Sequence, residues 1–246
     1  MSTTTPEKRD EFSRQNMENY LIRTGPELDI AALQALLQDT ELLIITIPPG
    51  RNQQQVHGNY TTQICSLIPY IEEAGIPEVI FTSSTTVYLS LQGLVNEDTV
   101  INPVSDMDRQ IFDIENSLLA VPAFHATILR LGALIGGERH PVRYIVQRPV
   151  VTEANNPVNM IHRHDIIRFV EKMLGQPMPN EVFNLVAPIH SSRRDFYTQE
   201  ANSLGLAPLP EFTDNPDADL RRVDGSRIAE RYGLQYEWFG SGNDKY

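Results

Sequence analysis

A run of hydroxyl side chains, Thr82 to Thr86, directly follows the apolar residues Val79, Ile80 and Phe81. A hydroxyl at the end of a buried strand needs a hydrogen-bond partner, because burying it unpaired is costly. Two interpretations are open. The hydroxyls bond to the local backbone as a turn, or Ser84 points at a carbonyl or alcohol of a ligand, which it would polarise by donating a hydrogen bond.

Basic side chains gather in a later segment that contains Arg130, Arg139, His140 and Arg143. They could bind an anionic ligand such as a nucleotide diphosphate, or they could form ordinary ion pairs in a solvated loop. Only 3 of the 20 basic residues are lysines, so a local anion site would be built from arginine.

A second cluster, His162, His164 and Asp165, has residue types that ligate metals. No further ligand set accompanies it in the sequence, so we expect no metal site. The simpler role for Asp165 is to cap a helix that begins there.

The elements that would position these residues alternate between strand and helix, which is typical of an α/β protein with a parallel sheet. Buried strands are predicted at 42–47 and 79–84, further strands at 125–131 and 181–186, and a short strand at 158–162. Helices are predicted after a cap at Asp29, at 58–74, at 105–120, from 165 onward, from a cap at Ser191 or Ser192 through 204, and at 227–232, and a glycine-rich loop is predicted at 132–141. Ligands bind at the carboxyl ends of such strands, here 46–50, 82–88 and 130–141.

The two ends of the chain lack the regular alternation of strand and helix that the sequence predicts for the middle. Residues 1–19 are polar and predict a frayed or weakly helical lead, and residues 20–23 predict a short strand. The last third is mixed. We therefore expect a domain over residues 1–150 and a small C-terminal, substrate-side subdomain over residues 151–246.

Composition excludes several partners. The net charge of −12 and the pI of about 4.9 argue against duplex nucleic acid and anionic membranes. The single cysteine, Cys65, cannot form a disulfide framework, and Met1 opens a polar run rather than a signal sequence. These features predict a cytoplasmic protein.

Several segments, taken in order, resemble the extended short-chain dehydrogenase/reductases, the NAD-dependent epimerase/dehydratase family. The segments cover roughly residues 20–236. They are Phe81–Tyr88, Glu97 to Pro103, Leu129 to Gly136, Asn159 to Ile166, Glu181 to Leu185 and Asp224 to Arg227, the last resembling an atypical bacterial branch.

The resemblance implies a Rossmann-like parallel sheet with helices on both faces and NAD or NADP as cofactor. It also implies a small-molecule substrate such as a sugar nucleotide. Ser84 matches the catalytic serine or threonine of the family. At the carboxyl edge, the expected cofactor contacts are Pro48, Ser83 and Leu131, and the expected substrate contacts are Arg130, His140, Asn159 and His162.

Two features depart from the family pattern. The sequence has no G-x-x-G-x-x-G or G-x-G-x-x-G turn, so the first βαβ unit of the family, which holds the cofactor pyrophosphate, has no counterpart. The family also uses Tyr-x-x-x-Lys for proton transfer. Met107 and Ile111 stand at those two positions, and no tyrosine of this sequence has lysine four residues later.

The first departure has a structural consequence. In the family, strand one lies next to the strand that corresponds to residues 42–47, so its loss leaves that strand with an open, apolar edge. We expect the edge to be covered by the 20–23 strand, by the N-terminal lead, or by a second subunit in a homodimer.

Three hypotheses for function follow. The chain is an NAD(P)-dependent epimerase, dehydratase or reductase with impaired catalysis. Alternatively, it is a non-catalytic ligand-binding or interaction protein on the same fold. In the third, it is the product of a truncated gene.

Overall fold

The computed structural model describes residues 1–24, 28–49, 60–137, 140–189, 191–214 and 220–238. The chain forms two compact units. The first consists of Met1–Thr82, Ser105–Ile128 and Met178–Glu181, and the second of Ser83–Val104, Leu129–Pro177 and Val182–Tyr246. The predicted domains, 1–150 and 151–246, stay a prediction. In the described part of the chain, no helix has the length and apolar character needed to cross a bilayer.

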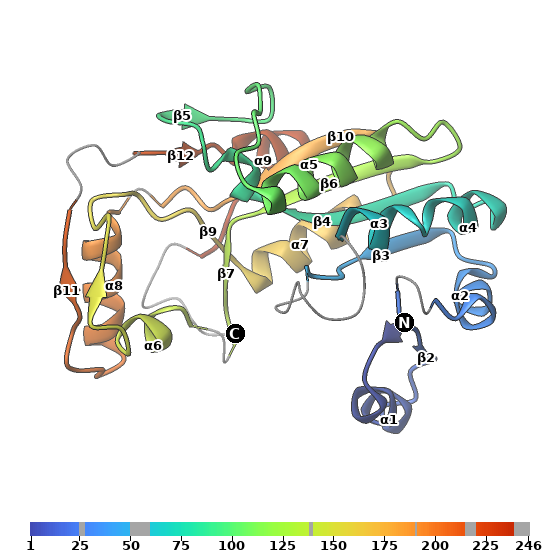
Figure 1. Ribbon diagram of the computed structural model, residues 1–246, viewed down its shortest axis with the longest axis horizontal. Helices are drawn as coiled ribbons and strands as arrows, with labels where there is room; N and C mark the ends of the chain where they lie inside the picture. Colours follow the sequence, from blue (N-terminus) through green and yellow to red (C-terminus); the bar gives the residue numbers. More distant parts are fainter. Residues whose placement is uncertain (25–27, 50–59, 138–139, 190, 215–219, 239–246) are drawn as a thin grey trace. The chain divides into compact units, whose positions relative to one another are not determined.

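The central sheet has the strand order β10-β6-β4-β3 (Figure 1). The predicted strands are confirmed, with bounds β3 Leu42–Ile45, β4 Glu78–Ser84, β6 His125–Leu131 and β10 Glu181–Leu185. The prediction that β3 is buried on both faces is wrong, because Ile44 is 43% exposed. β3 and β4 are parallel, with Leu42 opposite Glu78. β3 stops at Ile45, slightly before its predicted end, because Pro48 and Pro49 cannot donate to a ladder.

The helices of the first unit follow their sequence signals closely. α2 (Ile30–Leu37) is capped by Asp29, whose Oδ1 accepts a hydrogen bond from the Ala32 N–H at 3.0 Å. α5 (Asp106–Leu119) begins with a capping box in which Ser105 and Asp108 bond to each other's backbone N–H.

The helix predicted over residues 58–74 is instead two short helices. They are α3 (Tyr60–Cys65) and α4 (Ile68–Glu73), and residues 58–59 lie outside the described part of the chain. Pro69 stands in the first turn of α4, where its missing N–H is tolerated. α3 packs against α5, and the Tyr60 N–H donates to Gln110 Oε1 at 2.8 Å.

The N-terminal lead is more ordered than the sequence predicts. It forms β1 (Ser2–Thr3) and α1 (Pro6–Arg14), and β1 pairs in parallel with β2 (Tyr20–Leu21) as a separate two-stranded sheet. The strand predicted at 20–23 is therefore present, but its partner is β1 and not β3.

In its described residues, the second unit carries six short strands, of which the sequence predicts only the one at 158–162. Three parallel pairs of short strands join distant segments: β5 (Leu94–Val95) with β12 (Arg222–Val223), β7 (Ala133–Ile135) with β9 (Met160–His162), and β8 (Val150–Val151) with β11 (Glu211–Phe212). β7 lies inside the segment 132–141, which the sequence predicts as a loop. Strands of two or three residues are too short to show a periodic pattern.

The helices of the second unit are η1 (Thr85–Tyr88), α6 (Val142–Ile145), α7 (Arg163–Met173), α8 (Arg193–Ser203) and α9 (Ser226–Tyr232). The predicted cap of α8 is confirmed, because Ser192 Oγ accepts from the Asp195 N–H at 3.1 Å. The prediction that Asp165 begins and caps a helix is wrong. α7 starts two residues earlier, and its cap is the His162 ring, which accepts from the His164 N–H at 3.1 Å.

Candidate functional site

Ser84 lies at the carboxyl end of β4, where the sequence predicts it, and is half-buried. Its Oγ accepts a hydrogen bond from the Thr86 N–H at 3.2 Å and so starts η1. This contact is the local turn that was one of the two open interpretations. A serine hydroxyl that accepts one bond keeps its own proton to donate, so Ser84 can still polarise a ligand oxygen.

Tyr88, at the end of η1, is the centre of a buried polar network. Its hydroxyl donates to Asn184 Oδ1 at 3.0 Å and accepts from Arg130 Nη1 at 2.6 Å. All three residues are buried, Arg130 being 3% exposed. Burial raises the pKa of the Tyr88 phenol, and the nearby Arg130 charge opposes this shift. Arg130 thus has a structural partner inside the protein.

Glu97 joins the same network through the main chain of β10. Its Oε1 accepts from the Asn184 N–H at 2.7 Å, and its other oxygen lies 3.4 Å from the Arg227 guanidinium. Asn184 also donates through Nδ2 to the Asp224 carbonyl at 2.9 Å. Burial raises the pKa of the Glu97 carboxyl, and the hydrogen bond from Asn184 opposes the shift.

The contact of Asn184 with Asp224 brings in the segment Asp224 to Arg227. Gly225 is packed so closely that a Cβ there would collide with the Val186 carbonyl oxygen and lie 2.8 Å from the Tyr236 hydroxyl. That hydroxyl donates to the Gly225 carbonyl at 2.8 Å. The glycine is therefore required by this close approach.

Asn159, a predicted substrate contact, bonds to the backbone just before β12 and within it. Its Nδ2 donates to the Arg221 carbonyl at 3.1 Å, and its Oδ1 accepts from the Val223 N–H at 2.9 Å. The Arg221 side chain in turn donates to the Tyr88 carbonyl at 2.9 Å. The amide of Asn159 thus fixes the position of β12.

His162 is buried, caps α7 and stacks on Trp238 with ring centroids 5.8 Å apart. Gly136, at a φ of 120°, leaves the room that the ring needs, since a Cβ there would lie 2.6 Å from His162 Nε2. Asp165 is fully buried and accepts from the N–H groups of Glu237 and Trp238 at 2.9 and 3.2 Å. Its carboxylate therefore anchors residues 237–238 rather than capping the helix.

His140 is brought together with Glu200 of α8, a residue that the sequence analysis did not single out. The His140 Nε2 and Glu200 Oε2 atoms are 3.0 Å apart, and both side chains are buried. The His140 ring is therefore held by a carboxylate of α8, and its place in the predicted anion cluster stays a prediction. Arg139 lies outside them, and Arg143 belongs to α6.

The three expected cofactor contacts lie at strand ends, as predicted. Ser83 is 7% exposed, Leu131 is half-buried at the end of β6, and Pro48 is exposed beyond β3. Ser83 and Leu131 belong to the second unit and Pro48 to the first. In the described residues, no group of three or more His, Cys, Asp or Glu side chains is close enough to hold a metal ion.

Met107 and Ile111 both lie on α5, which follows β4 in the chain order that the resemblance implies. Ile111 is 4% exposed and forms part of the core, and Met107 is half-buried. Neither side chain can transfer a proton or carry a charge. At the two positions that the sequence resemblance aligns with the family's proton donor and lysine, α5 therefore carries apolar side chains.

No family model matches the sequence. Among curated proteins, the protein YeeZ of Escherichia coli (strain K12) is 35% identical over 240 residues, which cover 96% of this chain and 86% of YeeZ. The chain belongs to the YeeZ family.

Solved structures show which fold this YeeZ-family chain has. A UDP-glucuronic acid 4-epimerase from Bacillus cereus in complex with NAD has a TM-score of 0.76 at 17% identity, covering 96% of this chain and 83% of the epimerase. A short-chain dehydrogenase/reductase superfamily protein from Agrobacterium tumefaciens with bound NAD has a TM-score of 0.72 at 13% identity, covering 99% and 92%. The fold expected from the sequence resemblance is confirmed.

A functionally unknown conserved protein from Silicibacter pomeroyi has the same fold, with a TM-score of 0.72 at 21% identity, covering 96% of this chain and 84% of that protein. The fold thus occurs both in NAD-bound epimerases and in a protein whose function is unknown. For the YeeZ family, the fold alone does not decide between chemistry and binding.

Sequence reasoning missed the partners that hold the predicted residues in this YeeZ-family chain. Glu200, Arg221 and Trp238 belong to no motif. Their contacts with His140, Tyr88 and His162 respectively join residues at least 60 positions apart in the chain. In the sequence, Tyr88, Glu97 and Asn184 stand out only as members of the segments that resemble the family. A buried tyrosine and a buried asparagine each need hydrogen-bond partners, and this requirement is the signal that could have linked them.

The first prediction concerns the Tyr88 hydroxyl. Tyr88→Phe removes one hydrogen-bond partner from both Arg130 and Asn184 while leaving the ring in place. We expect the free energy of unfolding to fall by about 1–3 kcal/mol, because buried polar groups lose a partner that water cannot replace. Urea denaturation followed by circular dichroism measures the change.

Tyr144→Phe is the matched control, because Tyr144 lies on the surface of α6 with 63% of its area exposed. Its loss of a hydroxyl should change stability by less than about 0.5 kcal/mol. Equal effects of the two substitutions would contradict a special role for the Tyr88 network.

The second prediction concerns pH. Because burial raises the pKa of Glu97, the folded state binds this proton more tightly than the unfolded state does. Stability gained from the proton is fully present below the ordinary carboxyl pKa and is lost as the pH rises through the raised value. The stability of the wild type relative to Glu97→Gln should therefore decrease as the pH rises through this window.

Unfolding free energies of the wild type and Glu97→Gln, measured by urea titration across the acid range, check this trend. Glu72→Gln, at an exposed position of α4, is the control for loss of a carboxylate. A relative stability that increases with pH would contradict the assigned direction.

Proposed function

We propose that this chain is an epimerase/dehydratase-like protein that binds a small-molecule ligand and is impaired in the chemistry of that fold family. The observation that carries the proposal is the burial of Ile111 in the core of the first unit. Proton transfer by a tyrosine needs a neighbouring positive charge to lower its pKa. An isoleucine supplies none, and Met107 supplies no proton.

The ligand class comes from the resemblance and from proteins of the same fold. MoeE5 was solved in complex with UDP-glucose and NAD, and the Bacillus cereus epimerase with NAD. For this chain we propose NAD or NADP, weakly bound, together with a sugar nucleotide or a similar small molecule. Ser84 would donate a hydrogen bond to the ligand, and Pro48, Ser83 and Leu131 would contact the cofactor.

The four residues expected to contact substrate have another role in this proposal. Arg130, Asn159, His140 and His162 are engaged by Tyr88, β12, Glu200 and α7 respectively. They act as positioning residues that fix the walls around a ligand. The fixed walls would preserve ligand selectivity even where the reaction is lost.

The third prediction tests cofactor binding and chemistry separately. Calorimetric titration of the chain with NADH and with NADPH should give dissociation constants weaker than about 100 µM, because the sequence has no glycine turn to hold the pyrophosphate. Incubation with NAD and UDP-glucose should yield no NADH absorbance. Low-micromolar binding would contradict the first expectation, and turnover would contradict the second.

A second candidate function is that of a non-catalytic interaction protein, and the free edge of β3 favours it. Among the described strands, β3 pairs only with β4, although its side chains are apolar. A homodimer in which a second copy covers this edge stays a prediction of the sequence, as does the cytoplasmic location. Sedimentation equilibrium of the purified chain measures the oligomeric state directly.

A further inference from the structure

Exposed apolar side chains gather around one short pair of strands in the second unit. Leu94, on β5, is 68% exposed, and Leu220, two residues before β12, is 57% exposed. The two strands lie side by side, with Leu94 opposite Arg222 (Figure 1). Apolar side chains that are exposed close together mark interaction surfaces more often than isolated ones do.

The register places these side chains on one face of the strand pair. In β5, Leu94 is exposed and Val95 is buried, and in β12, Arg222 is exposed and Val223 is buried. Successive side chains of a strand point to opposite faces, and residues opposite each other share a face. Leu220 continues the alternation, because it stands two residues before Arg222 and is exposed as well. Leu94, Leu220 and Arg222 therefore form one surface, which we call the β5–β12 face.

Two adjoining segments add to the exposed apolar surface. Leu89 follows η1 directly and is 47% exposed, and Val100 and Val104 are 76% and 68% exposed. The Ser90 hydroxyl donates to the Asn102 carbonyl at 2.9 Å, so the segment with the leucine lies beside the segment with the two valines. Apolar side chains are thus exposed on three neighbouring segments of the second unit.

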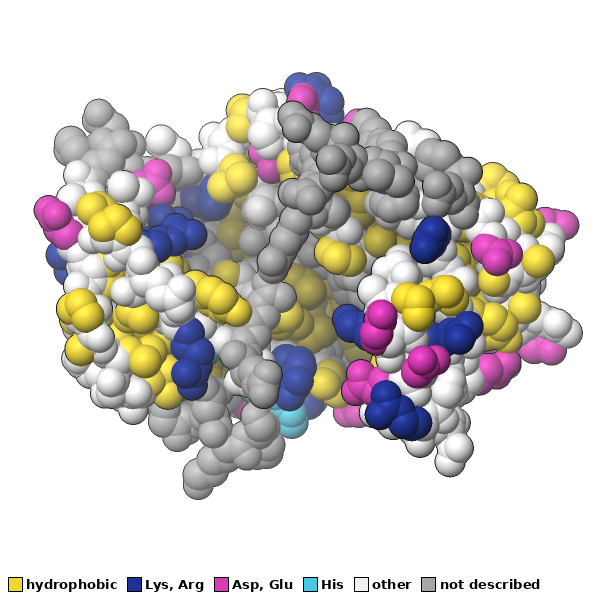
Figure 2. Space-filling model, turned by 60° about the horizontal axis from the view of Figure 1, so that its bottom comes forward, with side chains coloured by type: hydrophobic (Ala, Val, Ile, Leu, Met, Phe, Trp, Pro, Cys, Tyr) yellow, Lys and Arg dark blue, Asp and Glu magenta, His cyan; other side chains and the backbone are white. Residues whose placement is uncertain are grey.

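Exposure alone does not identify a binding surface. Hydrophobic side chains reach the surface at several separate places on the face drawn in Figure 2, with charged side chains among them. Single exposed apolar side chains are normal on folded proteins. A binding surface also needs a group that selects its partner.

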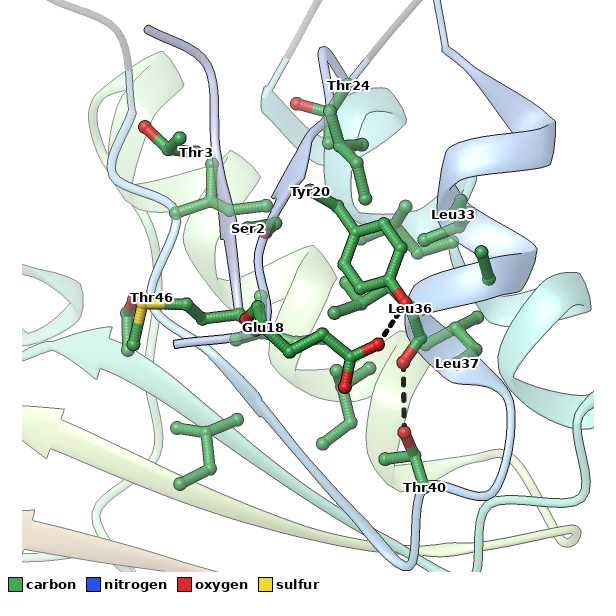
Figure 3. Close-up of a pocket in the computed structure, with 18 of the residues that line it drawn as sticks. Ser2, Thr3, Glu18, Tyr20, Thr24, Leu33, Leu36, Leu37, Thr40 and Thr46 are labelled. Carbon is green, nitrogen blue, oxygen red and sulfur yellow. Dashed lines mark hydrogen bonds between the residues drawn. The ribbon is translucent and has the colours of Figure 1, made fainter. Parts of the chain in front are cut away.

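The first unit has an apolar surface that lacks such a group. A cavity of about 1130 Å³ lies beside β3, with Leu33, Leu36 and Leu37 of α2 in its lining (Figure 3). Glu18 also lines it, but its carboxylate already accepts from the Tyr20 hydroxyl at 2.6 Å. Nothing in the described lining indicates which occupant this cavity takes.

On the β5–β12 face, the selecting group is the Arg222 guanidinium. Its side chain is exposed, and no hydrogen bond or ion pair of that side chain is found among the described residues. The nearby charges are already engaged, since Arg221 donates to a main-chain carbonyl and Arg227 pairs with Glu97 and Asp98. Arginine binds carboxylates through two parallel hydrogen bonds. The face therefore presents a carboxylate-binding group among apolar side chains.

Leu94 also offers main-chain groups to a partner. The Gly93 and Val95 carbonyls accept from the Arg222 and Asp224 N–H groups, both at 2.8 Å, so the N–H and C=O of Leu94 point away from β12. β5 has no second neighbour among the described strands, and no hydrogen bond to these two groups is found there. A peptide can pair with both groups, whereas a lipid would cover them without pairing them.

We infer that the β5–β12 face binds an acidic, apolar segment of another protein. One residue of the segment pairs with the main chain of Leu94, and a carboxylate of the segment pairs with Arg222. Opposite residues on strands two apart in a sheet are about 10 Å from each other. A glutamate next to Leu94 and the long arginine side chain together span this distance. Residues two positions from the glutamate share its face, so apolar residues there cover Leu94 and Leu220.

Other occupants fit these observations less well. A second copy that used the same small face in a two-fold dimer would bring the two Arg222 side chains close together, and like charges repel each other. An anionic membrane would match the arginine, but the net charge of −12 opposes its approach. The inference extends the second candidate function, that of an interaction protein, and does not depend on cofactor binding.

The fourth prediction uses a synthetic peptide of about nine residues with the core leucine-threonine-glutamate-threonine-leucine. Fluorescence anisotropy of the labelled peptide should show saturable binding to the full chain with a dissociation constant below about 500 µM. A second peptide, with lysine in place of the glutamate, should bind about tenfold or more weakly, because it meets Arg222 with a like charge. Equal binding of the two peptides would overturn the role of the arginine.

Exchanging the charges locates the ion pair. Arg222→Glu should weaken binding of the glutamate peptide by about tenfold or more and should bind the lysine peptide within about threefold of the original affinity. Loss of structure alone would not produce this recovery. Arg148→Glu, at an exposed arginine in the segment after α6, is the matched control. It should change either affinity by less than about twofold, and equal effects of the two variants would contradict the assignment.

A leucine variant tests the apolar part of the face. Leu94→Ser should weaken binding of the glutamate peptide by about fivefold or more, because less apolar surface is buried on binding. Leu174→Ser is the matched control, at a leucine that is 48% exposed at the end of α7. It should change the affinity by less than about twofold. An unchanged affinity of Leu94→Ser would overturn the inference.

Three further outcomes would overturn the inference. The first is binding of the glutamate peptide weaker than about 500 µM, or none. The second is a homodimer that excludes the peptide and dissociates in Leu94→Ser, which would identify a second copy as the occupant. The third is binding to phosphatidylserine vesicles that Leu94→Ser abolishes, which would identify a membrane. None of these outcomes bears on the titration with NADH, so failure of this inference and failure of the proposed ligand binding are distinguishable.

Discussion

A fully buried amide must have its hydrogen-bonding groups paired, and Asn184 on β10 meets this demand with three separate segments of the chain. Tyr88 donates to its side chain, Glu97 accepts from its main chain, and Asp224 accepts from its side chain. Tyr88 ends the short helix η1, and Glu97 and Asp224 lie outside helices and strands, so no regular backbone hydrogen-bond ladder holds these residues in place. The pairing of one asparagine therefore determines where η1, the loop before α5 and the start of α9 lie in the second unit.

The sequence predicts those parts of the structure whose signals are local. The strands 125–131 and 181–186 and the caps at Asp29 and Ser192 depend on neighbouring residues. The three short parallel pairs depend on segments more than 20 positions apart, and two or three residues carry no detectable period. The sequence therefore predicts which strand ends carry polar side chains, but it does not predict the hydrogen-bond partners of those side chains.

His140 and Asp165 show why residue type alone overstates chemistry. A histidine near arginines suggests an anion site, and an aspartate near histidines suggests a cap or a metal ligand. In the structure His140 pairs with Glu200, and Asp165 receives two N–H groups from residues 237 and 238. Both side chains stabilise the packing of distant segments. A buried charged group needs such a partner whatever its function. A charged side chain near a predicted site is therefore weak support for a reaction there.

Packing of the core and proton transfer require different side chains on α5. Packing requires apolar side chains facing the core, and Ile111 and Ile114 satisfy that demand. Proton transfer instead requires a tyrosine and a charged lysine on the same helix, and a lysine at position 111 would be a cation placed in the core. Ile111 on α5 therefore serves packing and supplies no positive charge. The fold of this chain is compatible with either role, binding or turnover, so the proposed impairment of catalysis depends on the residues of α5 alone.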